Sequence, residues 1–106
     1  MNKYHWSEIP VRKKMEGMNL RAIHSERITV AHWDFEPGVE LPEHSHPHEQ
    51  IAILQEGELE LTVDGEARRL QIGDVVVIPP NVKHSGRSLT ACRIIDLFSP
   101  AREDMK

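Results

Sequence analysis

A chain of 106 residues has room for one domain with one hydrophobic core, so residues 1–106 are expected to fold as a single unit. Its 17 acidic residues outnumber its 13 basic residues, for a formal net charge of -4, and this balance disfavours nucleic acid as a partner because phosphate backbones select basic surfaces. A lone cysteine, the lack of a secretory leader and the lack of any apolar run near the ~20 residues that span a bilayer predict a cytoplasmic protein without a membrane partner.

Alternating apolar and polar residues begin near Met18, and turn residues interrupt them at short intervals. The pattern is typical of an antiparallel β domain, because residues two apart on a strand share one face. Asp64-Gly65 between two such segments predicts a two-residue hairpin turn. Strands are expected at residues 27–35, 39–44, 49–55, 59–63, 67–71, 75–78 and 92–98.

The first predicted strand indicates how the segments would meet a core. Its residues form two alternating sets, and the more apolar set, expected to face inward, is Thr29, Ala31, Trp33 and Phe35. Five prolines between residues 37 and 80 exclude a long central helix, because proline lacks the backbone donor that a helix requires. The chain is therefore predicted to be all-β, as a sandwich or barrel of short strands.

Three of the seven histidines lie within five residues, at the end of a predicted strand. His44 and His46 share strand parity and can direct two imidazoles to one point, and Gln50 continues that parity. His84 comes from a separate segment and would complete a compact set of metal ligands. A solvated strand edge would show the same spacing, and His48 is either an additional ligand or a residue of the rim.

The sequence around these residues resembles the two sequence motifs of the cupin family. The first, at about residues 38–57, reads Gly38, His44-Ser45-His46, Gln50 and Gly57. The second, at about residues 73–88, reads Gly73, Pro79, Asn81 and His84, with Asn81 standing where cupins often have glycine. The resemblance implies a single-domain cupin jelly-roll β-barrel with a metal near its mouth.

The same resemblance implies that His44, His46, Gln50 and His84 hold one divalent transition metal. Gln50 occupies a position that a carboxylate usually fills, and a neutral amide leaves the bound cation more positive. That charge favours binding of an anionic oxygen over redox chemistry. Zinc, nickel, iron and manganese all accept imidazole and amide oxygen, so the metal stays open.

A closer resemblance covers nearly the whole barrel. Residues 44–50, 73–82 and 95–104 look like the corresponding tracts of the KdgF pectin degradation proteins. The resemblance implies a redox-neutral enzyme that converts cyclic 4,5-unsaturated monouronates, released by pectate and alginate lyases, to the linear 5-keto-4-deoxyuronate. Its partner would be a small uronate sugar, derived from galacturonate, mannuronate or guluronate.

Residues near the C-terminus fit that chemistry. Asp96 shares parity with apolar neighbours, and burial would raise its pKa and suit it to acid–base catalysis. Arg102 follows a proline and can fold over the mouth to hold a substrate carboxylate. Phe98 is expected to give the sugar an apolar wall, and His48 to contact it from the rim. An outward-facing Asp96 and a solvated Arg102 are the alternatives.

Two other functions stay open on sequence grounds. Many cupins activate O2 at an iron held by three histidines and one oxygen ligand, so a non-haem iron dioxygenase is the main rival enzyme. A non-catalytic module that binds a sugar or a metal is the second. A homodimer is expected from an outward-facing strand edge with Trp6 and Trp33 as anchors, and His32 is a candidate lining residue of the barrel.

Overall fold

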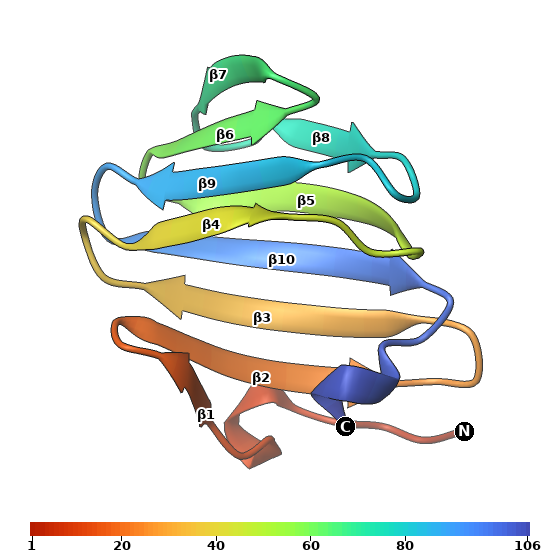
Figure 1. Ribbon diagram of the computed structural model, residues 1–106. Coiled ribbons are helices and arrows are strands. Elements are labelled where there is room, and N and C mark those ends of the chain that lie inside the picture. Colours follow the sequence, from red (N-terminus) through yellow and green to blue (C-terminus); the bar gives the residue numbers. More distant parts are fainter.

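The computed structural model describes residues 1–106, and most of the chain is in two antiparallel β-sheets (Figure 1). Two short 3₁₀ helices flank the strands, η1 (Trp6–Glu8) and η2 (Glu103–Met105). The strands are β1 (Arg12–Met15), β2 (Met18–His24), β3 (Thr29–Phe35), β4 (Glu40–His44), β5 (Glu49–Glu56), β6 (Leu59–Val63), β7 (Glu66–Leu70), β8 (Val75–Ile78), β9 (His84–Ser88) and β10 (Cys92–Ser99).

The larger sheet has the order β1-β2-β3-β10-β5-β8, and the smaller has the order β4-β9-β6-β7. The smaller sheet lies in front of the larger one in Figure 1. None of the helices has the length and apolar composition needed to span a bilayer. The architecture is all-β with two packed sheets, as the alternation and the turn residues predict, and it is the jelly roll that the resemblance to cupins implies.

All seven predicted strands are present, with ends displaced by no more than two residues. The alternation near Met18 belongs to β2, which was not predicted as a separate strand. The strands β1 and β9 were missed because their residues are mostly charged or polar, without an apolar period of two. Pairing with β2 and β6 therefore decides their conformation more than their own composition does.

The hydrophobic core lies between the sheets. In β3 the buried residues are Thr29, Ala31, Trp33 and Phe35, which confirms the predicted inward set. Trp33 packs edge-on against Phe35, with ring centroids 5.8 Å apart. The expectation that Trp33 anchors a dimer is therefore wrong, because its side chain is committed to the core.

A second expectation about β3 also fails. His32 alternates with the buried set, so it lies on the outer face of the larger sheet and does not line the barrel. There it packs against Trp6, with ring centroids 5.2 Å apart. This contact places the N-terminal segment on the outer face at β3.

The turn after β5 supplies a test of the fold. Gly57 has φ +86°, and a Cβ added there would overlap the carbonyl oxygen of Ala91 and lie 2.9 Å from Thr90 Oγ1. Replacing Gly57 by alanine is expected to lower the free energy of unfolding by about 3 kcal/mol, measured by urea denaturation. Gly65 has φ +78° with open space around it, so Gly65→Ala should lose only about 1 kcal/mol. Equal losses in the two variants would contradict the steric explanation.

Candidate metal centre

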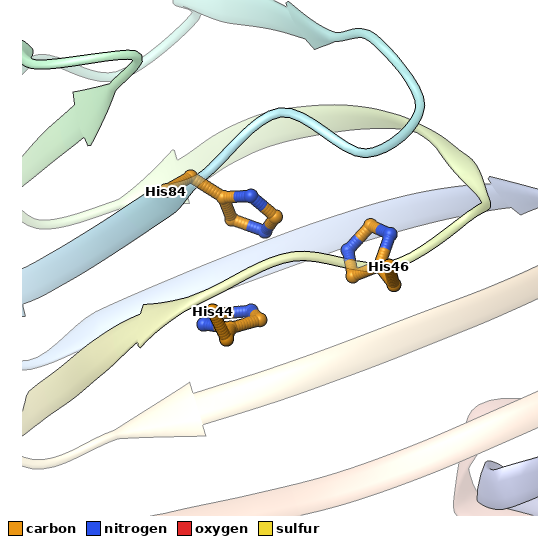
Figure 2. A group of neighbouring side chains, drawn as sticks. All are labelled: His44, His46 and His84. Carbon is orange, nitrogen blue, oxygen red and sulfur yellow. The ribbon is translucent and has the colours of Figure 1, made fainter.

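Three histidines meet between the sheets, and Figure 2 shows His44, His46 and His84 close together. Their potential ligand atoms all lie within 4.8 Å of one another. His44 and His84 are register partners across β4 and β9, and their ring centroids are 4.2 Å apart. The pairing of two strands therefore fixes two of the three imidazoles.

His46 is positioned by a loop contact and not by a strand. Its backbone carbonyl accepts a hydrogen bond from the N–H of Asn81 at 2.8 Å, which ties the loop after β4 to the turn before β9. Asn81 has φ +65°, a left-handed conformation that asparagine adopts more readily than most residues. An asparagine can thus serve in this turn where cupins often have glycine.

The hydrogen bonds of the three rings suit metal binding. Each Nδ1 lies within hydrogen-bond distance of a backbone carbonyl, which can only accept, so Nδ1 carries the proton and Nε2 keeps its lone pair. Contacts of this kind orient metal-binding histidines. Burial lowers the pKa of His46 and of His84, which favours the neutral ring that a metal requires. The Nδ1 contacts are His44 to Pro42 at 2.8 Å, His46 to His48 at 3.0 Å and His84 to Val82 at 2.9 Å.

Gln50 adds an oxygen to the cluster. It is buried on β5, with its Oε1 3.1 Å from Nε2 of His46, while its amide nitrogen donates to Asp96 Oδ1 at 3.1 Å. Since Nε2 of His46 carries a lone pair, two acceptors face each other, an arrangement that a shared cation stabilises. The three histidines and Gln50 therefore fit one divalent metal. The neighbouring carboxylate of Glu49 is exposed, because successive residues of β5 point to opposite faces.

Asp96 is a buried carboxyl in the same space, with 8% of its surface exposed. Its register partners are Ala31 on β3 and Ala52 on β5, so its immediate neighbours across the sheet are small and apolar. Burial raises the pKa of Asp96 to about 7, against the opposing effects of the Gln50 hydrogen bond and the Arg102 charge. A carboxyl with this pKa can both give and accept a proton near neutral pH.

Arg102 folds back from the C-terminal tail onto the site. Its guanidinium lies 4.6 Å from the centroid of the Phe98 ring, and its side chain is only 12% exposed. The backbone N–H of Arg102 donates to Thr29 Oγ1 at 2.8 Å. Two further hydrogen bonds, at 2.9 and 2.7 Å, join the guanidinium to Asp104 and lower the pKa of that carboxyl to about 2. Arg102 is therefore held in place and not free in solvent.

His48 lies beside the cluster but outside the group of three histidines. Its ring centroid is 5.5 Å from that of His46 and 6.5 Å from that of Phe98. Its Nδ1 is buried without a hydrogen-bond partner. Buried polar atoms normally have a hydrogen-bond partner, so this nitrogen is an exception, and the substrate contact expected of His48 stays a prediction.

The histidine cluster, Asp96 and Arg102 border one cavity of about 300 Å³, a volume near the lower end of ligand pockets, whereas His48 is not among its lining residues. Its walls are largely apolar, with Trp33 and Ile94 among them. A larger cavity of about 440 Å³ borders β8, but none of its lining residues is a histidine. The predicted site residues that line the smaller cavity are His44, His46, Gln50, His84, Asp96, Phe98 and Arg102.

Two residues of this arrangement escaped sequence analysis. Thr29 is a polar residue within the inward set of β3, and Asp104 follows Arg102 by two positions. The sequence positions of Thr29 and Asp104 do not indicate that either side chain contacts Arg102. Thr29 and Arg102 are 73 positions apart, and only the pairing of β3 with β10 brings them together.

Comparisons with known proteins agree with this fold. The family model described as cupin domain matches residues 31–98. The KdgF pectin degradation protein of Dickeya dadantii (strain 3937) is 32% identical over 100 residues, which cover 92% of this chain and 91% of that protein. The solved structure of KdgF from Halomonas sp. has a TM-score of 0.94 at 29% identity and covers 100% of this chain and 99% of that chain.

A second solved structure, an RmlC-like cupin from Shewanella frigidimarina NCIMB 400, has a TM-score of 0.93 at 30% identity. It covers 97% of this chain and 94% of that chain. The chain therefore belongs to the cupin family, as its two motifs predict. Within the cupins, it belongs to the family of KdgF pectin degradation proteins.

The buried carboxyl predicts a pH-dependent stability. The pKa of Asp96 is about 7 in the folded protein, against about 3.9 for an unfolded aspartate, so folding favours the protonated carboxyl. The contribution of this group to the free energy of unfolding is therefore complete below about pH 4 and is lost as the pH rises through 7. Asparagine stays neutral at every pH. In metal-free protein, the free energy of unfolding of Asp96→Asn should therefore equal that of the wild type near pH 4. Near pH 8 it should be higher than that of the wild type by up to about 4 kcal/mol.

Urea denaturation across this pH range measures the difference. Asp34, on the outer face of β3, provides the control, and Asp34→Asn should show no comparable rise. A difference between Asp96→Asn and wild type that is constant with pH would contradict the burial of a titrating carboxyl.

Proposed function

We propose that this cupin opens the ring of 4,5-unsaturated monouronates from pectin or alginate breakdown and yields the linear 5-keto-4-deoxyuronate. The observation that carries the proposal is one cavity bordered by the histidine cluster, a buried carboxyl of pKa about 7 and a fixed arginine. Membership of the KdgF family supports a role in pectin degradation. The proposed location is the cytoplasm, which suits a chain whose one cysteine is free.

The proposed reaction is an isomerisation and consumes no oxidant, reductant or water. The hydroxyl at C1 loses its proton, the bond between C1 and the ring oxygen breaks, and C1 becomes an aldehyde. The ring oxygen becomes the ketone oxygen at C5 while C4 gains a proton. The protein must therefore move protons, bind a carboxylate and stabilise charge on oxygen.

Asp96 is the group that we assign to proton transfer. Its carboxyl lies in an apolar environment, and its pKa of about 7 leaves both protonation states populated near neutral pH. As a base it would accept the proton of the C1 hydroxyl, and as an acid it would deliver a proton to C4. The hydrogen bond from Gln50 fixes the direction of the carboxyl within the cavity.

Arg102, Phe98 and His48 are the residues that we assign to substrate binding. The guanidinium lies over Phe98 and uses Nε and Nη2 for Asp104, which leaves Nη1 for the carboxylate of the sugar. The Phe98 ring offers an apolar surface beside the sugar ring. His48 lies beside Phe98, and we assign its unpartnered Nδ1 to a hydroxyl of the sugar.

The metal belongs to the proposal as a cofactor held by His44, His46, His84 and Gln50. When bound, a divalent cation would supply a Lewis acid for an anionic oxygen of the sugar, without a change of oxidation state. Zinc, nickel, iron and manganese all suit three imidazoles and an amide oxygen. Gln50 touches both the cluster and Asp96, so it would align the acid–base group with the cation site.

Incubation with lyase-generated unsaturated galacturonate tests substrate, reaction and metal dependence together. The ultraviolet absorbance of the conjugated double bond should fall with metal-loaded protein, persist after chelation, and fall again when metal is restored. Asp96→Ala should lose turnover by at least about a hundredfold with normal metal content, because the proton-transfer group is gone. Asp34→Ala makes the same change on the outer face and should keep wild-type turnover.

Other outcomes separate the rival functions. Oxygen consumption with a thiol or a flavonol, and no effect on unsaturated uronates, would indicate a dioxygenase and overturn the proposal. Tight binding of the sugar with unchanged absorbance would indicate a binding module. Turnover retained by Asp96→Ala would remove Asp96 from the mechanism while leaving the substrate class in place.

A further inference from the structure

The strand β1 carries three consecutive basic residues, Arg12, Lys13 and Lys14, at one edge of the larger sheet. Two of them have partners within the chain. Arg12 donates a hydrogen bond to the backbone carbonyl of Met105, and the ammonium of Lys13 pairs with Glu16, whereas no ion pair or hydrogen bond engages the side chain of Lys14. One cation of this strand is therefore free to bind a ligand.

A β-bulge directs this free cation. Lys13 lies opposite Asn19 and Met15 lies opposite Met18, so Lys14 is one extra residue between two register pairs. In a regular strand successive side chains point to opposite faces, whereas a bulge re-aims a side chain and is common next to active sites. Lys14 and Met15 accordingly both line the cavity between the sheets, and Lys13 does not.

Lys14 thus shares its cavity with the histidine cluster and the proposed acid–base group. Apart from the histidines, the lining residues with ionisable side chains are Lys14, Asp96 and Arg102. Asp96 is buried, whereas Lys14 is exposed and therefore stands where the cavity opens to solvent. An anionic ligand that enters the cavity would pass this ammonium.

The charge of Arg102 alone does not balance a bound anion. Asp104 already holds the guanidinium through two hydrogen bonds, and its pKa of about 2 keeps that carboxyl ionised at neutral pH. A substrate carboxylate at Nη1 of Arg102 would place a second negative charge beside one positive charge. A second cation would stabilise this arrangement, because charges that leave bulk water need to be paired.

The position of β1 beside the C-terminal tail suits Lys14 to this role. Lys14 and Asp104 border a second, smaller cavity of about 190 Å³, together with Arg12 and Met105. The hydrogen bond from Arg12 to Met105 attaches β1 to η2, the helix that follows Arg102. The strand with the free lysine and the tail with the arginine are therefore neighbouring sides of one opening.

We propose that Lys14 and Arg102 together bind the carboxylate of the sugar, so that the site accepts free uronates and discriminates against their uncharged esters. A carboxylate has two oxygens with about four acceptor positions, and it can therefore accept hydrogen bonds from both cations. This role of Lys14 rests on the proposed function, because it names a second residue that recognises the acid group of that substrate.

Steady-state kinetics with unsaturated galacturonate test the role of Lys14. The sugar carboxylate keeps its charge throughout the proposed isomerisation, so Lys14 would bind substrate and transition state equally. Lys14→Ala should therefore raise KM about tenfold with kcat almost unchanged, and Lys14→Arg should stay within about threefold of the wild-type KM. Lys13→Ala removes the same charge at the neighbouring residue outside the cavity and should keep the wild-type KM.

The two alanine variants separate a contact from an effect of net charge. An equal rise of KM in Lys14→Ala and Lys13→Ala would show that overall charge attracts the substrate, and it would overturn the inference. An unchanged KM in Lys14→Ala would overturn it as well. Circular dichroism checks that each variant is folded, and Lys14→Gln replaces Lys14→Ala if that variant is unfolded.

Calorimetry distinguishes this inference from the proposed function, because saturated galacturonate and its methyl ester bind without the double bond that the reaction needs. The wild type should bind the acid more tightly than the ester, and Lys14→Ala should reduce that ratio of affinities about tenfold while Lys13→Ala preserves it. This result without turnover of the unsaturated sugar would overturn the proposed function and keep the inference. Turnover with the same ratio in Lys14→Ala and wild type would keep the proposed function and overturn the inference.

Discussion

Successive residues of a β-strand point to opposite faces of a sheet, and in β5 and β10 this alternation places two different surfaces one residue apart. Gln50 and Asp96 are buried in the cavity, whereas their neighbours Ile51 and Leu97 lie on the outer face. A slip of one residue in either strand would exchange the two surfaces. The composition of the site and of the outer face therefore depends on one register, which the apolar core between the sheets holds in place.

A buried carboxyl is unfavourable when charged, and the structure compensates for this only in part. Gln50 donates to Asp96, and Arg102 lies close enough to lower its pKa, yet burial remains the larger effect. Burial of Asp96 thus lowers the stability of the protein at neutral pH, and the same burial gives the carboxyl a pKa that suits proton transfer. Functional groups often combine these two effects. The amide of Gln50 has two contacts in the site: its oxygen faces His46, and its nitrogen donates a hydrogen bond to the carboxyl of Asp96.

The sequence predicted the features that arise from local periodicity. The Asp64-Gly65 dipeptide was enough to locate the hairpin between β6 and β7. Alternation in the last predicted strand placed Asp96 among residues that are buried, although an outward-facing Asp96 stayed open on sequence grounds. The shared parity of His44 and His46 was not the reason for their proximity, because His46 lies in the loop after β4. Sequence patterns could not predict contacts between distant segments. Nothing near Thr29 in the sequence indicates that its hydroxyl would accept a hydrogen bond from the backbone of Arg102. The assignment of His32 to the barrel lining was wrong, and the alternation of its own strand already argued against it, because His32 lies between two residues of the predicted inward set.

Elemental analysis after metal loading and dialysis measures directly whether the three histidines and Gln50 bind a metal ion. We expect one divalent ion per chain in the wild type and none in His46→Ala or His84→Ala, since each change removes a ligand of the cluster. His5→Ala, a change at an exposed histidine outside the cluster, should retain the ion. A wild-type protein that binds no metal, or a folded His84→Ala variant that retains a full equivalent of metal, would contradict metal binding by this cluster.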